Sequence, residues 1–186
     1  TQGVSSAASD VYKRQVMFTC ASLAMVHGYD LKDAQAAGLL HDSAKCIPNK
    51  KKLKMCAEHN IPVTPFEKEH PFLLHAKLGA YVARAKYGIT DEEILSSITF
   101  HTTGKPEMST LEKIVYIADY IEPARNKAPN LTEVRKLAFE DLNECMYAIL
   151  RDTLTYLDKN PDDVDSATKD AFAYYDTLHK ERQESR

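Results

Sequence analysis

The stretch Gly38-Leu-Leu-His-Asp-Ser-Ala-Lys45 is the most informative part of the chain, because it puts ionisable residues at the end of a helix whose other positions suit a buried face. The helical pattern is expected to run from Leu31 to about Cys46. The small residues Ala37 and Gly38 leave room for a neighbouring helix to approach closely. His41 lies four residues after Ala37, on the same face, so its imidazole is expected to point into the protein.

The rest of the chain also predicts helices, and we expect an all-α helical bundle. Glycine is scarce, at 6 residues, and runs of alternating Val, Ile and Thr that would indicate strands are missing from the sequence. Thr90 with Glu93, and Ser109 with Glu112, have the spacing of capping boxes that open helices. A longer helical pattern covers residues 131–158, with an expected break near Glu140.

Length and composition favour a single domain. A chain of 186 residues with 44% apolar residues can bury one hydrophobic core. Residues 1–15 begin with a Ser/Ala/Gly-rich stretch without apolar periodicity, and the string over residues 6–15 resembles translated sequencing-adaptor sequence. We therefore expect residues 1–15 to be disordered or non-native, and the domain to occupy residues 16–183.

Charge and cysteine usage exclude several classes of partner. The net charge is −3 with acidic and basic residues interspersed, so no extended basic face is expected for long nucleic acid. No apolar run approaches the roughly 18 residues of a membrane span. The four cysteines are widely spaced and lack a C-x-x-C pair, which is typical of reduced thiols in a cytoplasmic protein.

Several ionisable residues fall on faces that the hydrophobic pattern assigns to the core. Asp119 lies inside the apolar and aromatic stretch 114–121, and His101 extends the stripe that contains Ile98. His75 likewise begins an apolar stripe on its own helix. Burial of an unpaired charge is costly, so these groups need partners in the interior. Each one alone could be an ordinary hydrogen-bonded core residue.

Taken together, these residues predict a metal site. His41, Asp42, His75, His101 and Asp119 come from four helical segments, one of which carries the adjacent pair His41 and Asp42. A shared metal would satisfy all of them at once. A set of imidazoles and carboxylates without thiolates suits iron, manganese or zinc in a hydrolytic site better than a structural zinc site. The alternative of a purely structural helical protein would leave Asp119 and His101 buried without partners.

Candidate phosphate ligands surround this set. Lys45 lies four residues after His41 on the same helix face, where a cation would serve a metal-bound phosphate. His70 could bind phosphate or cap the chain, and Arg125 could grip a phosphate or form a surface ion pair. Thr102 and Thr103 could line the substrate cleft or only end their helix.

The assembled pattern resembles the YqeK family of HD-domain proteins. The resemblance rests on Gly38-Leu-Leu-His-Asp-Ser-Ala-Lys45, Pro71-Phe-Leu-Leu-His75, His101-Thr-Thr-Gly104 and Ile117-Ala-Asp-Tyr-Ile-Glu-Pro123, in this order. It covers the chain from about Val16 to the C-terminal helix. It implies a bacterial HD-domain bundle that hydrolyses diadenosine tetraphosphate symmetrically to two ADP. It also implies a two-metal, typically di-iron, centre.

The resemblance also implies a role for each matching residue. One metal would be held by His41, Asp42 and Asp119, and the other by His75 and His101, with Asp42 bridging the two. Asp42 and Lys45 would be the catalytic residues. The phosphates of a dinucleoside polyphosphate would be bound by Lys45, His70, Thr102, Thr103 and Arg125. A homodimer is an expectation taken from the family alone.

One departure from the family lies near the start of the chain. The family has a His-Thr-x-Gly-Val segment that supplies the first metal histidine, and in register with it this chain has Tyr12-Lys-Arg-Gln-Val16. A phenol is a poor substitute for an imidazole, so we expect impaired activity. Two alternative functions follow: an HD-domain phosphohydrolase of another nucleotide (a nucleoside mono- or triphosphate or a cyclic dinucleotide), or a nucleotide-binding regulatory module with impaired catalysis.

Overall fold

The computed structural model describes residues 2–157 and 164–185, with the side chains described from residue 11 onward. Every regular element in these ranges is helical, which confirms the expected all-α class. The elements are α1 (Gln2–His27), α2 (Leu31–Leu40), α3 (Asn49–Glu58), α4 (Pro65–Glu69), the 3₁₀ helix η1 (Pro71–Leu74), α5 (His75–Tyr87), α6 (Glu92–Phe100), α7 (Thr110–Tyr120), α8 (Leu131–Glu140), α9 (Leu142–Leu157) and α10 (Ser166–Glu184).

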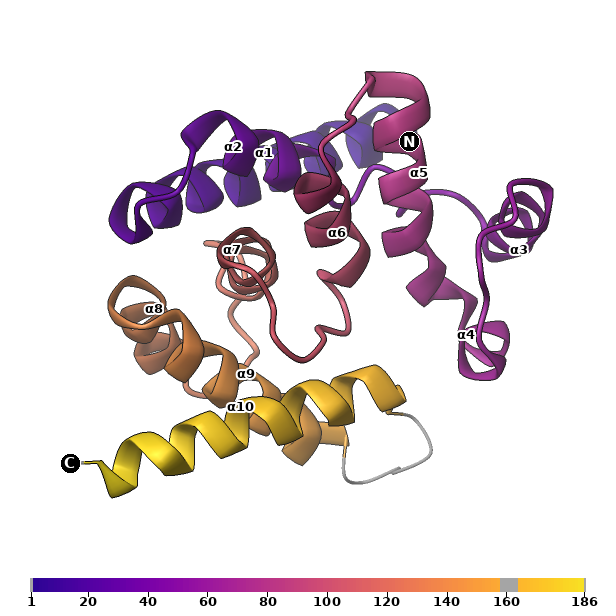
Figure 1. Ribbon diagram of the computed structural model, residues 1–186. Coiled ribbons are helices and arrows are strands. Elements are labelled where there is room, and N and C mark those ends of the chain that lie inside the picture. Colours follow the sequence, from indigo (N-terminus) through magenta and orange to yellow (C-terminus); the bar gives the residue numbers. More distant parts are fainter. Residues whose placement is uncertain (1, 158–163, 186) are drawn as a thin grey trace.

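Helix α7 lies at the centre of the bundle, with α1, α2, α6 and α9 around it (Figure 1). Its side chains Leu111, Ile114 and Ile117 are fully buried, so it carries much of the main core. The capping box expected at its start is confirmed, because Ser109 and Glu112 exchange side-chain and backbone hydrogen bonds. This fixed start sets the register that brings Asp119 to the far end of the helix.

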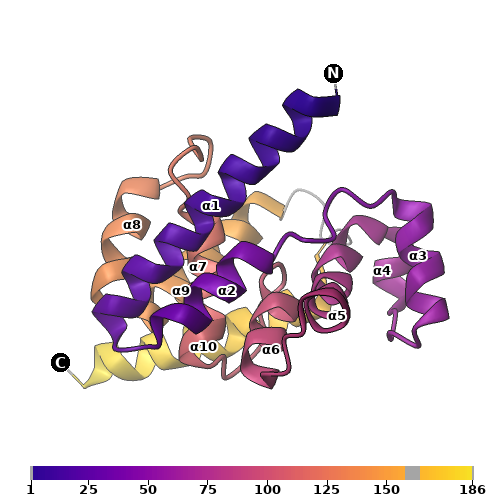
Figure 2. The ribbon, with the colours of Figure 1, turned by 90° about the horizontal axis from the view of Figure 1, so that it is seen from above.

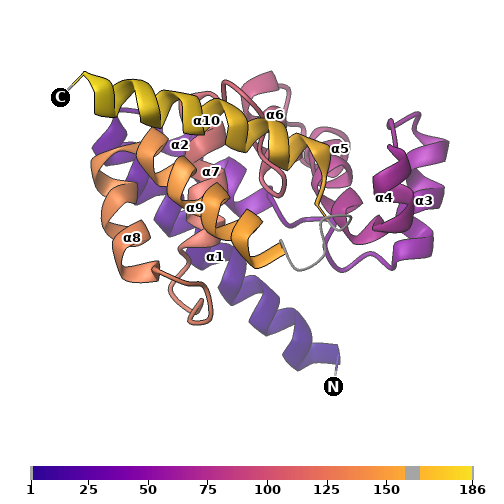
Figure 3. The same cartoon turned by 90° about the horizontal axis from the view of Figure 1, so that it is seen from below.

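Helices α3 and α4 lie at one side of the molecule, away from α8 and α9 (Figure 2). They cover a small second core formed by Ala44, Cys56, Leu74 and Leu78. Helix α10 lies along α9 on the opposite face of the bundle from α1 (Figure 3). No helix among the described residues has the length and apolar character needed to cross a lipid bilayer.

Helices α1 and α2 pack closely because α2 carries small residues on the facing side. A Cβ atom placed on Gly38 would lie 2.7 Å from Sγ of Cys20 and 3.0 Å from Cα of Met17. Ala34 and Ala37 are also fully buried. The close approach that the sequence predicted for this face is thus present, and it brings α1 next to His41.

Several helix boundaries differ from those expected from the sequence. Helix α1 begins at Gln2, inside the segment 1–15 that we expected to be disordered or non-native, because a helix nucleated downstream extends at little cost through residues that lack proline. The non-native origin of residues 1–15 stays a prediction. Helix α2 ends at Leu40, since the chain then switches to tighter i to i+3 hydrogen bonds through His41–Cys46.

One expected helix start differs in the structure, and one expected helix break is confirmed. The Thr90 and Glu93 capping box is wrong: Asp91 caps α6 instead, and its side chain accepts from the backbone N–H groups of Glu93 and Ile94. The break expected near Glu140 is confirmed, because α8 ends there.

Candidate metal centre

The same kind of hydrogen bond fixes the orientation of each of the three buried histidine side chains. Each one donates a hydrogen bond from Nδ1 to the carbonyl oxygen three residues earlier in the chain. The distances are 2.7 Å from His41 to Gly38, 2.6 Å from His75 to Phe72, and 2.7 Å from His101 to Ile98. A proton on Nδ1 leaves the Nε2 lone pair of each neutral ring free to bind a metal.

All three Nε2 atoms point at the carboxylate of Asp42. Oδ1 of Asp42 lies 3.3 Å from Nε2 of His75 and 3.6 Å from Nε2 of His101. Oδ2 lies 3.4 Å from Nε2 of His41. Asp42 therefore lies between the His41 imidazole, which faces Oδ2, and the other two imidazoles, which face Oδ1.

Asp119 completes the group on the His41 side. Its Oδ1 lies 3.5 Å from Nε2 of His41, although the two residues are far apart in sequence. The structure thus brings together all five residues that the sequence predicted for the metal site. They come from the segment after α2, the start of α5, the end of α6 and the end of α7.

The donor set fits a metal ion. Ligand atoms about 2.0–2.2 Å from one ion lie roughly 3 Å or more apart, which matches the separations found here. Atoms of His41, Asp42 and His101 all lie within 4.8 Å of one another, and all three residues are buried. Nε2 of His41 and Oδ1 of Asp42 are buried without a hydrogen-bond partner among the described residues. Buried polar atoms of this kind normally have a partner, and a cation would supply one.

The charged groups of the site shift one another's pKa values. Burial opposes a charge on His41, but the nearby carboxylates of Asp119 and Asp42 outweigh it and raise the pKa of His41 to about 9. Burial also raises the pKa of the Asp42 carboxyl, yet the close imidazoles of His101, His41 and His75 outweigh this and lower the pKa well below its usual range. The carboxylate form that a metal requires is thus strongly favoured.

His101 behaves differently from His41. Its complete burial lowers the pKa of its imidazole despite the nearby Asp42 carboxylate, and nearby His41 adds to the lowering. The neutral ring is the form that ligates metal. The pKa of Asp119 is lowered, because the nearby His41 and the hydrogen bond from Tyr12 outweigh burial.

The predicted phosphate ligands lie at different distances from this cluster. Lys45 forms an ion pair with Oδ2 of Asp42 at 2.6 Å, and its side chain is 54% exposed. Arg125 donates from Nη2 to the backbone carbonyl of Asp119 at 3.2 Å. The hydroxyl of Thr102 lies 3.3 Å from Nε2 of His101 and 3.5 Å from Nε2 of His75.

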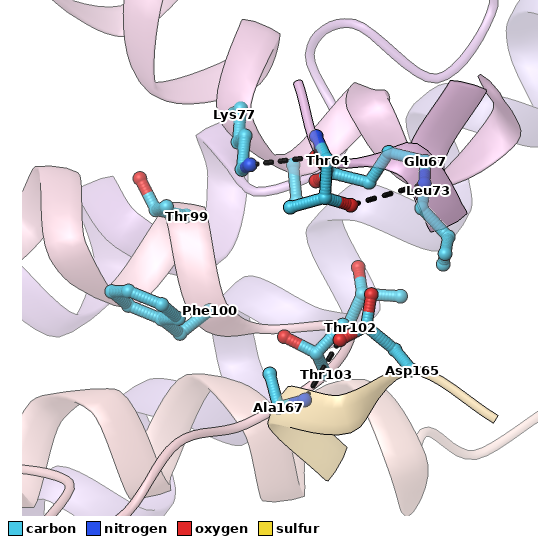
Figure 4. A pocket seen from close by; sticks show the side chains of 11 residues that line it. Thr64, Glu67, Leu73, Lys77, Thr99, Phe100, Thr102, Thr103, Asp165 and Ala167 are labelled. Atoms are coloured by element: carbon cyan, nitrogen blue, oxygen red, sulfur yellow. Dashed lines mark hydrogen bonds and ion pairs between the residues drawn. The ribbon is translucent and has the colours of Figure 1, made fainter. Parts of the chain in front are cut away.

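Thr103 and His70 are set further back. The hydroxyl of Thr103 donates to the carbonyl of Gly104, and its side chain lines a small pocket beside the cluster (Figure 4). His70 places Nδ1 3.2 Å from the carbonyl oxygen of Phe66 and stacks on the Phe66 ring. Binding of phosphate by either residue stays a prediction.

One contact in the site was missed by sequence reasoning. Tyr12, on α1, donates a hydrogen bond from its hydroxyl to Oδ1 of Asp119, and Nζ of Lys45 lies 5.1 Å from the centroid of its ring. The family resemblance aligns its first metal histidine with position 12. Nothing in the local sequence, however, indicated that the Tyr12 phenol would reach the Asp119 carboxylate.

Comparisons with known proteins agree with this geometry. The HD-domain family model matches residues 14–124. A symmetrical bis(5'-nucleosyl)-tetraphosphatase of Bacillus subtilis (strain 168) is 41% identical over 144 residues, which cover 77% of this chain and 76% of that protein. A protein of the same name from Staphylococcus aureus (strain NCTC 8325 / PS 47) is 32% identical over 165 residues, covering 87% of this chain and 83% of its own.

A solved structure shows the same fold. It is a predicted HD superfamily hydrolase involved in NAD metabolism from Clostridium acetobutylicum, with a TM-score of 0.87 and 36% sequence identity. The match covers 91% of this chain and 89% of that one. This chain therefore belongs to the HD-domain family and, within it, to the family of symmetrical bis(5'-nucleosyl)-tetraphosphatases.

Proposed function

We propose that this chain is a metal-dependent hydrolase that cleaves diadenosine tetraphosphate symmetrically into two ADP. The observation that carries the proposal is the convergence of three Nε2 atoms on the two oxygens of Asp42. The names of the relatives from B. subtilis and S. aureus support the substrate and the symmetrical cleavage. Phosphorus–oxygen hydrolysis is also the chemistry that such a nitrogen and oxygen donor set serves well.

The proposed cofactor is a pair of divalent metal ions, with iron preferred and manganese or zinc as alternatives. His41, Asp42 and Asp119 would hold one ion, and Asp42, His75 and His101 the other. When bound, such ions lower the pKa of a coordinated water towards neutrality and neutralise charge on phosphate. Asp42 belongs to both proposed ligand sets, so binding of both metal ions would depend on its carboxylate.

The protein itself supplies position and charge. The Nδ1 hydrogen bonds to backbone carbonyls fix the imidazole rings before substrate arrives, so no reorientation is needed. Lys45 is half exposed and can turn from Asp42 to a phosphate oxygen, where its charge stabilises the transition state. Arg125 approaches from the Asp119 side, and the Thr102 hydroxyl from the side of His75 and His101.

Tyr12 favours a second candidate function, a nucleotide-binding regulatory module with impaired catalysis. Its hydroxyl uses Oδ1 of Asp119, an oxygen that we assign to a metal. The phenol resists ionisation, because burial and the charge of Asp119 raise its pKa. Tyr12 therefore offers a neutral donor where a metal needs a lone pair, and we expect weakened metal binding on the His41 side.

Elemental analysis of the purified protein together with product analysis tests the proposal. We expect bound iron, manganese or zinc, and ADP as the sole nucleotide product from diadenosine tetraphosphate. Release of ATP with AMP would contradict symmetrical cleavage. Turnover of nucleoside mono- or triphosphates or of cyclic dinucleotides would instead support another HD-domain phosphohydrolase. Nucleotide binding without turnover, even in Tyr12→His, would support the regulatory module. The homodimer and the cytoplasmic location stay predictions.

A further inference from the structure

A second pocket adjoins the centre on the Asp119 side, between the loop that follows α7 and the end of α9. Its volume is about 320 Å³. This lies at the lower end of the roughly 300–1,000 Å³ typical of small-molecule sites. We call it the Tyr156 pocket, and the residues that define it are Tyr120, Arg125, Lys127, Asp152, Thr153 and Tyr156.

Arg125 connects the Tyr156 pocket to the metal centre. Its Nη2 donates to the backbone carbonyl of Asp119, and its guanidinium lies 5.1 Å from the centroid of the Tyr120 ring. The Nε atom of Arg125 is buried without a hydrogen-bond partner among the described residues. A phosphate bound near Asp119 would reach this group, and whatever is attached to that phosphate would extend into the pocket.

The lining of the pocket suits a nucleoside. Tyr156 is 74% exposed, so its ring is available to stack on a base. Asp152 is buried and held in place, since its carboxylate accepts from Nδ2 of Asn130 at 3.2 Å and from the Arg151 guanidinium at 2.9 Å. A fixed carboxylate with a remaining acceptor position can bind ribose hydroxyls.

The pocket on the other side of the centre does not suit a nucleoside. It is lined by Thr102 and Thr103, among others (Figure 4). The Thr102 hydroxyl lies 3.5 Å from Nε2 of His75 and 3.3 Å from Nε2 of His101. The volume of this pocket is about 110 Å³. Lys77 already pairs with Glu67 there at 2.8 Å. Of these two pockets beside the centre, the Tyr156 pocket is therefore the better site for a base and ribose.

We propose that the Tyr156 pocket binds one nucleoside of the substrate, with Tyr156 stacked on the base and Asp152 accepting from the ribose hydroxyls. This assignment rests on the proposed function, because it presumes a phosphate chain at the centre. It places Arg125 on the phosphate nearest that nucleoside. Recognition of the nucleoside is thereby separate from recognition of the phosphate chain.

Calorimetric titration of the purified, metal-containing protein with ADP and with pyrophosphate tests the assignment. Tyr156→Ala should weaken ADP binding about tenfold, because stacking on an aromatic side chain contributes roughly 1–3 kcal/mol and 1.4 kcal/mol is a factor of ten. It should leave pyrophosphate binding unchanged. The control Tyr87→Ala removes a tyrosine that is 52% exposed at the end of α5, and it should alter neither affinity.

Asp152→Asn tests the ribose contact. This variant should weaken binding of ADP but not of 2',3'-dideoxy-ADP, because only ADP offers ribose hydroxyls to the carboxylate. Equal losses for both ligands would overturn the ribose contact. Absence of ADP binding by the wild-type protein, or equal affinity of wild type and Tyr156→Ala for ADP, would overturn the pocket assignment.

Hydrolysis assays on the same proteins keep the two proposals apart. If the wild type releases ADP from diadenosine tetraphosphate and Tyr156→Ala keeps its KM and its ADP affinity, the function stands and the pocket assignment fails. If the wild type releases no ADP but Tyr156→Ala still loses ADP affinity selectively, the pocket assignment stands and the proposed function fails.

Discussion

The hydroxyl of Tyr12 on α1 donates a hydrogen bond to Oδ1 of Asp119 on α7. The same oxygen lies 3.5 Å from Nε2 of His41, so the phenol shares one carboxylate oxygen with a metal-site histidine. Helix α1 thus contributes a side chain to the centre, from the position that the family resemblance gives to histidine.

Replacing Tyr12 by histidine is expected to raise both metal content and activity. The imidazole adds a lone pair beside Asp119 and frees Oδ1, so the gain in metal affinity should be about tenfold or more. Metal per chain, measured by elemental analysis, and the rate of ADP release check this. Tyr12→Phe frees Oδ1 without adding a ligand, so a gain as large as that of Tyr12→His would contradict the explanation.

Asp42→Asn is expected to remove metal binding. An amide keeps the size of the carboxylate but loses its charge, and Asp42 is the only residue whose oxygens face both groups of imidazoles among the described residues. Metal affinity and activity should each fall by at least about 100-fold. Asp33→Asn, on α2 and outside the centre, is the control. Normal metal content in Asp42→Asn would rule out the proposed bridging role.

Lys45→Met is expected to reduce turnover without loss of metal. The ammonium group is not a metal ligand in our assignment, but its charge would stabilise the phosphate in the transition state. We expect kcat to fall about 100-fold. Lys54→Met removes a lysine from an exposed ion pair with Glu58 and should leave kcat unchanged. Unaltered kcat in Lys45→Met would show that Lys45 only balances the charge of Asp42.

Gly38→Ala is expected to destabilise the fold. The added Cβ would lie 3.0 Å from Cα of Met17, a backbone atom that cannot move independently of α1. Overpacking of this kind costs about 1–3 kcal/mol, and each kcal/mol lowers Tm by roughly 2–4 °C in a domain of this size. Thermal unfolding would measure it, with exposed Lys32→Ala as the control. An unchanged Tm would show that the α1 and α2 interface adapts.

Asp141→Asn is expected to lower stability at neutral pH but not in acid. The Asp141 carboxylate accepts from the backbone N–H groups of Asn143 and Glu144 and from Nη1 of Arg182. Burial opposes its charge, but the hydrogen bond from Arg182 and the others outweigh this and lower the pKa of Asp141.

The sign of this pH dependence follows from the depressed pKa. The stabilisation is fully present above the ordinary carboxyl pKa of about 4, and it is lost as pH falls through the lower folded value. At pH 7 the variant should lose about 0.5 kcal/mol, since solvent screens this partly exposed pair. Denaturant unfolding at several pH values checks this, and a difference that grows in acid would contradict it.

The helical class and the identity of the residues that gather at the centre could be predicted from the amino-acid sequence. Helical spacing places His75, His101 and Asp119 on apolar faces of their own segments. His75 and His101 are buried, as this predicts, and Asp119 is partly buried. The capping box of Ser109 and Glu112 was equally predictable, because all its hydrogen bonds lie within a few residues of chain.

The contacts between these groups, and the residues that border the site, depend on the tertiary structure and could not be predicted from the sequence. Tyr12 and Asp119 are far apart in sequence, and they meet because α1 packs on both α2 and α7. The Tyr156 pocket likewise depends on how the loop after α7 lies against α9. Local spacing fixes the face of a helix on which a side chain lies. The distance between side chains on different helices depends on the packing of whole elements, which no single segment encodes.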